Sequence, residues 1–182
     1  MTRLALLHRR ALAAGVFVLS VLLCTLWSVP YRTMEATIVG RTLSILTKTV
    51  TSDDRFEVAG PSGGWMWFEV TIECTSAILL VPVAVVAAWF LSQPRVQVRL
   101  ALLGFAVGWA IVALSSTLRL FLIGFNFHAV GLSSFWLTHD FLGTLISIVS
   151  ALIALLAQIR IASIGSGAQF RQFRTERSFS PE

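Results

Sequence analysis

The chain has 182 residues, of which 56% are hydrophobic and only 13% are charged. A water-soluble domain of this size needs a mostly polar surface, so this composition excludes an ordinary soluble fold and indicates a protein embedded in lipid. The formal net charge of +5 at pH 7 is compatible with binding either nucleic acid or a membrane surface. The positions of the basic residues, described below, favour the membrane.

Long apolar runs predict four membrane-spanning helices. A helix rises about 1.5 Å per residue, so about 20 apolar residues cross a hydrocarbon core of ~30 Å. Helices are expected because backbone exposed to lipid must satisfy its own hydrogen bonds. We therefore expect an all-α integral membrane protein that forms a single membrane domain over residues 1–182. The expected spans are residues 11–29, 70–91, 100–124 and 138–161.

Arginine and lysine residues predict the orientation of these spans. They are absent from the connection between the third and fourth spans, and acidic residues offset them between the first and second spans. Elsewhere they flank the spans on the opposite side: Arg3, Arg9, Arg10, Arg95, Arg99, Arg160, Arg171, Arg174 and Arg177. Because basic residues favour the cytoplasmic side, we expect both termini in the cytoplasm of a multi-pass protein of the plasma (cytoplasmic) membrane. The basic excess then indicates topology and contact with lipid head groups, and no nucleic-acid partner is expected.

The first apolar run has an alternative interpretation as a cleaved signal peptide. Arg9 and Arg10 followed by an apolar stretch fit the basic and apolar regions of such a signal. No small-residue cleavage site follows the run, and residues 26–31 (Leu-Trp-Ser-Val-Pro-Tyr) fit an anchor at the membrane interface. We therefore expect the first helix to be retained.

Residues 30–69 form the only sizeable segment expected outside the membrane, on its outer side. Residues 34–50 space apolar side chains among charges, which is typical of an amphipathic helix lying on the membrane. A β-hairpin should follow, because the turn-forming stretch Gly60-Pro61-Ser62-Gly63-Gly64 separates an alternating segment from an aromatic one. Trp65 and Trp67 fit an aromatic belt at the interface or, alternatively, a part in holding a peptide substrate.

The remaining polar features predict neither a disulfide nor a cofactor. Cys24 lies inside the first apolar run and Cys74 at the outer edge of the second, so the two are expected at different depths. Cys24 fits a small buried apolar residue. No cysteine spacing indicates a metal or redox cofactor, and none is expected. The basic tail, residues 163–182, is expected to be disordered in the cytoplasm.

Cys74, Arg119 and His139 are expected to share one depth at the outer face. About 18 residues separate Cys74 from Ser92 and about 19 separate Leu100 from Arg119, so the two helices have matching lengths of roughly 27–29 Å. His139 then opens the fourth span in the same layer. Arg119 is the most informative of the three, because a charge within an apolar span is costly and usually functional. Its alternative role is to reach the outer head groups by extending along the helix.

These residue types fit nucleophilic catalysis on a peptide bond. A cysteine thiolate attacks a carbonyl to give a thioester, which water or an amine then resolves. Histidine exchanges protons near neutral pH, and arginine holds a carboxylate or an oxyanion. Each residue also has a structural interpretation: Cys74 as packing, His139 beside Asp140 as a helix cap, and Glu73 as a solvated interfacial residue.

The segments around these three residues resemble the exosortase/archaeosortase family of membrane cysteine transpeptidases. The matching elements are Glu73-Cys74-Thr75-Ser76, Thr117-Leu118-Arg119-Leu120 and His139-Asp140-Phe141-Leu142-Gly143. Their order, spacing and place at outer helix ends agree with the family, and the similarity covers roughly residues 35–160. The chain departs from the family where Ser116 replaces a frequent Asn and Ser76 a frequent Gly. Many members have more spans than the four expected here, so the chain resembles the catalytic core of the family alone.

By this resemblance, Cys74 is the nucleophile, Arg119 binds the substrate or stabilises the oxyanion, and His139 is the acid and base. Further candidate substrate contacts are Glu73, Ser116, Asp140, Trp65 and Trp67. The implied substrates are exported proteins whose C-terminal sorting signal combines a recognition motif, a transmembrane helix and a basic end. The implied reaction is cleavage near the outer face and transfer to an amine-bearing acceptor, such as a membrane lipid or a surface polymer.

Two other functions use the same features. A serine intramembrane protease would take Ser133, in the sequence Gly131-Leu132-Ser133, as its nucleophile and His139 as its base. A non-enzymatic membrane assembly or transport subunit would pair Arg119 with an acidic residue of a partner. The cysteine mechanism predicts instead that Cys74, Arg119 and His139 border one pocket that opens outward or into the outer leaflet, because its proton transfers require hydrogen-bond reach.

Overall fold

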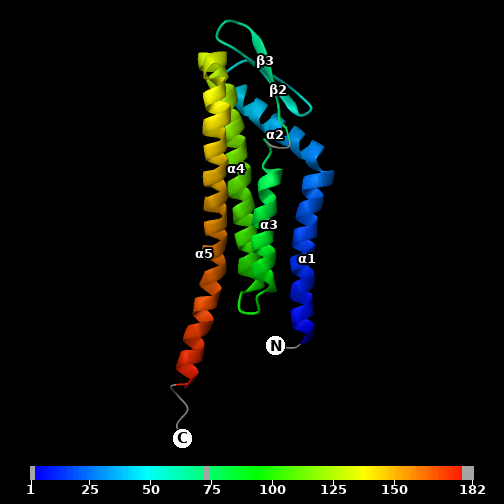
Figure 1. Cartoon of the computed structure of the whole chain (residues 1–182), viewed down its shortest axis with the longest axis vertical. Coiled ribbons are helices and arrows are strands. Elements are labelled where there is room, and N and C mark those ends of the chain that lie inside the picture. The colour runs from blue at the N-terminus through cyan, green and yellow to red at the C-terminus, as the bar shows by residue number, and fades with distance from the viewer. Residues whose placement is uncertain (1–2, 72–73, 178–182) are drawn as a thin grey trace.

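The computed structural model describes residues 3–71 and 74–177. Long helices run side by side, and a small sheet covers one end of them, while both chain ends lie at the opposite end (Figure 1). In chain order the elements are α1 (Arg3–Leu26), α2 (Ser28–Leu43), β1 (Thr49–Ser52), β2 (Arg55–Ala59), β3 (Trp65–Glu69), α3 (Ala77–Ser92), α4 (Val98–Val130), a 3-10 turn η1 (Leu132–Ser134), a π-helical turn η2 (Leu137–Leu142) and α5 (Gly143–Arg177).

Three of the described helices are long and apolar enough to cross a membrane: Leu6–Leu26, Val98–Val130 and Leu137–Ile164. At most 22% of each most apolar stretch is buried within the chain, so most of these apolar side chains face outward. A surface of this kind is suited to lipid. The structure therefore agrees with a multi-pass membrane protein.

The helix of the second expected span is shorter than the sequence predicted. It was expected from Val70, but α3 begins at Ala77 and has 16 residues. Val70 still belongs to the sheet region, because its N–H donates to the Asp54 carbonyl at 2.9 Å. Cys74 and Thr75 then form a turn by donating to the Thr71 carbonyl. The apolar composition around Val70 favours a helix, but its backbone contact keeps it in the sheet region, and α3 starts only at Ala77.

The outer segment also differs from the prediction. The hairpin of β2 and β3 around the Gly60–Gly64 turn is confirmed, but β1 makes the sheet three-stranded, in the order β1-β2-β3. The helix expected over residues 34–50 is α2, which follows α1 almost directly and ends at Leu43. Residues from Thr49 leave the helical pattern because they pair with β2, with Thr49 opposite Val58.

The end of α5 gives a further correction. The sequence predicted a disordered tail from Ser163, but the helix continues through Arg177. The preceding apolar turns already provide a formed helical template, and adding residues to a helix costs less than starting one.

One apolar core fixes the sheet against the helices. Side chains of β2 and β3 pack on α2 and on the C-terminal half of α4, and the cluster includes Ala36, Val39, Leu43, Phe56, Val58, Phe68, Leu120, Ile123 and Phe127. Gly124 permits a close approach of α4 to this cluster, because a Cβ added there would lie 2.7 Å from Leu43 Cδ1. The sheet, α2 and α4 therefore form one packed unit around the chain that leads to Cys74.

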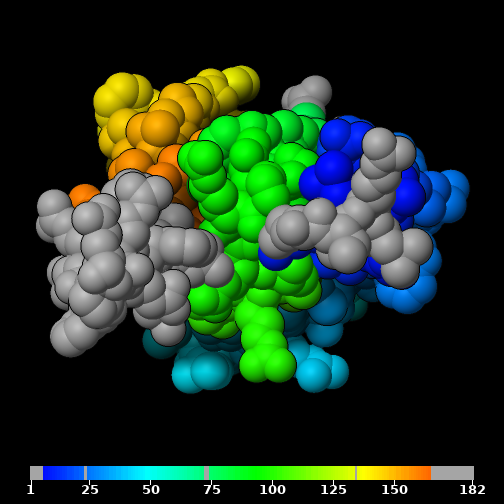
Figure 2. Space-filling model, turned by 90° about the horizontal axis from the view of Figure 1, so that it is seen from below, coloured from blue at the N-terminus to red at the C-terminus, as the bar shows by residue number. Residues whose placement is uncertain are grey.

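The remaining helices pack beside this unit. Viewed from the end that carries both termini, α3 and α4 (green) lie between α1 (blue) and α5 (orange) (Figure 2). Gln158 of α5 is fully buried and donates from Nε2 to the Val83 carbonyl of α3 at 3.1 Å. This contact joins α3 and α5 away from the candidate site, which lies between the N-terminal ends of α3 and α5 and the C-terminal half of α4.

Candidate active site

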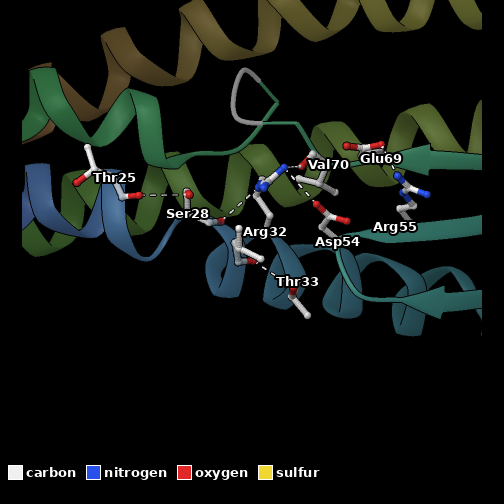
Figure 3. Close-up of polar contacts among 9 residues, drawn as sticks. Thr25, Ser28, Arg32, Thr33, Asp54, Arg55, Glu69 and Val70 are labelled. Atoms are coloured by element: carbon white, nitrogen blue, oxygen red, sulfur yellow. Dashed lines mark hydrogen bonds and ion pairs between the residues drawn. The ribbon is translucent and has the colours of Figure 1, made fainter.

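Arg32 of α2 fixes the chain that leads from β3 to Cys74. Its Nη1 donates to the Val70 carbonyl at 3.3 Å and lies 3.1 Å from Asp54 Oδ2 (Figure 3). The close-up shows Arg32 reaching from α2 toward the end of the sheet, where Val70 and Asp54 meet (Figure 3). One cation thus binds both Val70, at the end of the sheet region, and Asp54.

Glu35, one helical turn further along α2, holds the chain that follows Cys74. Its side chain is 2% exposed, and Oε1 accepts hydrogen bonds from Ser76 Oγ at 2.7 Å and Ser76 N at 3.3 Å. The Tyr31 hydroxyl lies 2.7 Å from the same Ser76 Oγ, and burial raises the pKa of Tyr31. A buried carboxylate is tolerated only where such hydrogen bonds compensate its lost hydration. The turn that carries Cys74 is therefore anchored on both sides by one face of α2.

Sequence reasoning missed Glu35. The expected apolar stripe included Met34 and Ile38, but both are exposed, and Glu35 shares its face with the buried Val39 and Leu43. The spacing of four residues from Glu35 through Val39 to Leu43 is the signal that could have placed the carboxylate on the packed face.

His139 is brought to Cys74 across 65 residues of sequence. His139 Nε2 lies 4.0 Å from Cys74 Sγ, and His139 Nδ1 lies 2.7 Å from Asp140 Oδ1. The imidazole also stacks on Phe135, with ring centroids 5.2 Å apart. His139 belongs to the π-helical turn η2, a local widening that frequently occurs at functional sites. The thiol of Cys74, the imidazole of His139 and the carboxylate of Asp140 thus form a series of contacts.

Arg119 approaches Cys74 from the opposite side. Its Nη2 donates to the Cys74 carbonyl at 3.3 Å, and its Nη1 donates to Ser147 Oγ at 2.7 Å. Ser116 Oγ donates to the same Cys74 carbonyl at 3.3 Å. In the described chain Arg119 forms no ion pair, and its Nε is buried without a hydrogen-bond partner. The guanidinium is therefore a cation without a neutralising carboxylate in the parts of the chain that are described.

Two cavities meet at Cys74, where the sequence predicted a single pocket. The larger, of about 210 Å³, lies between α3, α4 and α5 and contains Arg119. Its polar lining consists of hydroxyl groups from Thr75, Ser115, Ser116, Thr144, Ser147 and Ser150. The smaller, of about 130 Å³, lies between β3 and η2 and contains His139. Cys74 borders both, so Arg119 and His139 lie in separate spaces on either side of its turn.

The other predicted contacts are divided between the site and its surroundings. Trp67 borders the smaller cavity, and the Arg55 guanidinium lies 5.1 Å from its ring centroid. Trp65 faces a separate open hollow beside residues 44–50 and does not join the cluster. Asp140 is exposed, and its only described role is the contact with His139. Glu73 lies outside the described residues.

Ser133 is not placed as a nucleophile. It is exposed in η1, and no hydrogen bond joins it to His139 in the described chain. Cys24 makes a different contact: its Sγ donates to the carbonyl of Ala77, three residues after Cys74, at 2.9 Å, and no hydrogen bond joins it to His139 in the described chain. Within residues 3–71 and 74–177, no three His, Cys, Asp or Glu side chains gather as metal ligands.

No family model matches the chain, and no curated protein or solved structure shows a significant similarity to it. The function is therefore inferred from the geometry of the site.

Proposed function

We propose that this protein is a membrane cysteine peptidase or transpeptidase of the exosortase type, which acts on the C-terminal sorting signals of exported proteins. The observation that supports this proposal is the approach of His139 Nε2 to Cys74 Sγ, 4.0 Å apart, with Arg119 beside the Cys74 carbonyl. Polar and charged groups gathered among apolar helices are costly, and catalysis is a function that uses all three.

The proposed reaction begins with the His139–Asp140 contact. When Nδ1–H of His139 donates to Asp140, Nε2 presents its lone pair to the thiol of Cys74 and takes its proton. The resulting thiolate attacks the carbonyl carbon of the substrate, whose oxygen becomes an oxyanion that Arg119 stabilises. The intermediate collapses by breaking the C–N bond, and the imidazolium gives its proton to the leaving amine. Water or an acceptor amine then attacks the thioester and restores the thiol.

The proposed topology has four crossings, with both termini in the cytoplasm and the sheet outside. In support, both chain ends lie at the end of the helical bundle opposite the sheet (Figure 1). α3 then forms the fourth crossing despite its 16 residues. A short helix is accommodated by local thinning of the bilayer at modest cost.

The reaction is tested in the native host by mass spectrometry of exported proteins. Cells that carry the Cys74→Ala variant should lose the processed C-termini that wild-type cells produce, and the unprocessed forms should keep their C-terminal helix. Cys24→Ala is the matched control, because this second cysteine bonds to the Ala77 carbonyl and makes no hydrogen bond with His139 in the described chain, and it should process normally. Identical C-termini in wild-type and Cys74→Ala cells would refute the enzymatic proposal.

The lack of an ion pair for Arg119 in the described chain also favours a second candidate function, a subunit that pairs this cation with a partner's carboxylate. Such a subunit would tolerate Cys74→Ala and would lose its partner on purification of Arg119→Gln. The peptidase would instead lose its processing activity in the Cys74→Ala variant.

A further inference from the structure

The outer strand of the sheet has a free edge next to Cys74. The strand order is β1-β2-β3, so among the described residues β3 pairs on one side only. The opposite edge of the sheet is covered, because β1 lies against α2 and Thr49 Oγ1 donates to the Gly40 carbonyl at 3.0 Å. An uncovered edge presents unpaired backbone groups and is a ready template for another strand.

The register shows which backbone groups of β3 face outward. The Val70 N–H donates to Asp54, and the Gly60 N–H donates to Gly64, at the two ends of the β2–β3 ladder. Hydrogen-bonded pairs alternate with non-bonded pairs in antiparallel strands, so Phe68 and Met66 bond to β2. The N–H and C=O of Trp67 therefore point away from β2, as do those of Trp65 and Glu69.

The smaller cavity follows this free edge. Its lining includes Met66, Trp67, Phe68 and Glu69, which are consecutive residues of β3. Successive side chains of a strand point to opposite faces, so a cavity that touches all four runs along the edge itself. Phe135 and His139 also line this cavity, and the core side chains of Phe56, Leu120 and Ile123 close it beneath the sheet. We call this space, from Met66 along the edge to Cys74 and His139, the β3 groove.

We propose that the β3 groove binds an extended peptide as an added fourth strand, and that this peptide is the substrate segment that precedes the cleaved bond. The inference rests on the proposed function, which supplies a peptide substrate. Strand addition satisfies the free N–H and C=O of Trp67, and an apolar side chain of the peptide enters the groove beside Phe68 and Phe135. The segment before the bond is assigned because it lies outside the membrane, where the sheet is, while the sorting helix stays in the bilayer.

The β3 edge is tested with a pair of substitutions at Trp67. Both Trp67→Pro and Trp67→Val remove the indole, but only proline removes the N–H, and it leaves the β2 pairing intact because Trp67 does not bond to β2. Processing of the same exported proteins that depend on Cys74 should be about tenfold slower for Trp67→Pro than for Trp67→Val, as expected for a lost backbone hydrogen bond near the reacting group. Equal rates for two variants whose Cys74 reacts normally with iodoacetamide would overturn strand addition.

Cross-linking identifies the peptide that lies in the β3 groove, and it tests strand addition even if Trp67→Pro does not fold. The photoreactive residue p-benzoylphenylalanine replaces Trp67 in a Cys74→Ala background, and Trp27, an exposed tryptophan between α1 and α2, is the control position. Position 67 should cross-link to peptides just before the bond that the wild-type protein cleaves, and position 27 should not. Cross-links that map beyond the bond, or none at either position, would contradict the proposal.

The two proposals fail in different ways. If Cys74→Ala leaves every exported C-terminus unchanged, the peptidase proposal fails. If Cys74→Ala abolishes processing but Trp67→Pro matches Trp67→Val and position 67 gives no mapped cross-link, only strand addition fails.

Discussion

At the scale of single residues, the site depends on two charges that lie at the base of a turn. Glu35 accepts hydrogen bonds from the N–H and the hydroxyl of Ser76, and Arg119 donates to the carbonyl of Cys74. Neither charge lies in the short turn that it holds, and each comes from a different helix. The position of the Cys74 thiol is thus set by packing between helices as much as by its own backbone.

Glu35→Ala should lower the free energy of unfolding by about 1–3 kcal/mol, because it leaves the buried N–H and hydroxyl of Ser76 without this acceptor. Thermal unfolding of the detergent-solubilised protein measures the change. The exposed Glu57 provides the control, since Glu57→Ala should change stability by less than about 0.5 kcal/mol. Equal effects of the two substitutions would show that the Ser76 contacts do not stabilise the fold.

At the scale of elements, the packed unit of the sheet, α2 and α4 explains which predictions succeeded. Local signals were sufficient for the hairpin, because the glycines of residues 60–64 specify a turn without help from the rest of the chain. They were insufficient for β1 and for the start of α3. Thr49 and Val70 are held by β2 and by Asp54 respectively, contacts that no window of sequence contains.

The candidate site was predictable to a similar degree. Helix lengths predicted that Cys74, Arg119 and His139 lie at one depth, but they did not show that the side chains meet. The division of the site into two cavities was not predictable, because it depends on which face of α4 carries Arg119 and on the π-helical turn that holds His139. Glu35 was missed because apolar spacing was assigned to the exposed side of α2.

Gly124→Ala should destabilise the protein by about 1–3 kcal/mol, because its Cβ would lie 2.7 Å from Leu43 Cδ1 and 3.2 Å from Phe56 Cε2. Gly15 is the matched control, because a Cβ added there has nothing within 4 Å. Gly15→Ala in α1 should be neutral or slightly stabilising, as alanine favours helices. Thermal unfolding of both variants checks the prediction. An unchanged stability of Gly124→Ala would mean that the sheet, α2 and α4 are loosely packed at this position.

At the scale of the whole molecule, the sheet and the chain ends lie at opposite ends of the helical bundle (Figure 1). Arg9 of α1 donates to the carbonyls of Gln93 and Val96, at 2.6 and 2.9 Å, in the link between α3 and α4. This contact closes the end of the bundle that the proposed topology places in the cytoplasm.

The topology predicts where an added cysteine reacts with a membrane-impermeant maleimide. In a Cys24→Ala, Cys74→Ala background, Ser62→Cys in the hairpin turn should be labelled in intact cells. Arg95→Cys, in the link between α3 and α4, should be labelled only after lysis. Both positions are exposed on the protein, so accessibility within the fold does not separate them. Labelling of Arg95→Cys in intact cells would reverse the proposed orientation.

The shortness of α3 affects the outcome of the reaction as well as its place. A helix of 16 residues is about 24 Å long, which is less than the ~30 Å of a hydrocarbon core. On the proposed topology, with the bilayer thinned around α3, Cys74 lies three residues before Ala77 and therefore near the level of the lipid head groups. Water is less abundant there than in bulk solution, whereas an amine carried on a lipid head group is concentrated beside it. A thioester formed there is sheltered from hydrolysis, so the length of one helix favours attachment of the cleaved protein over its release.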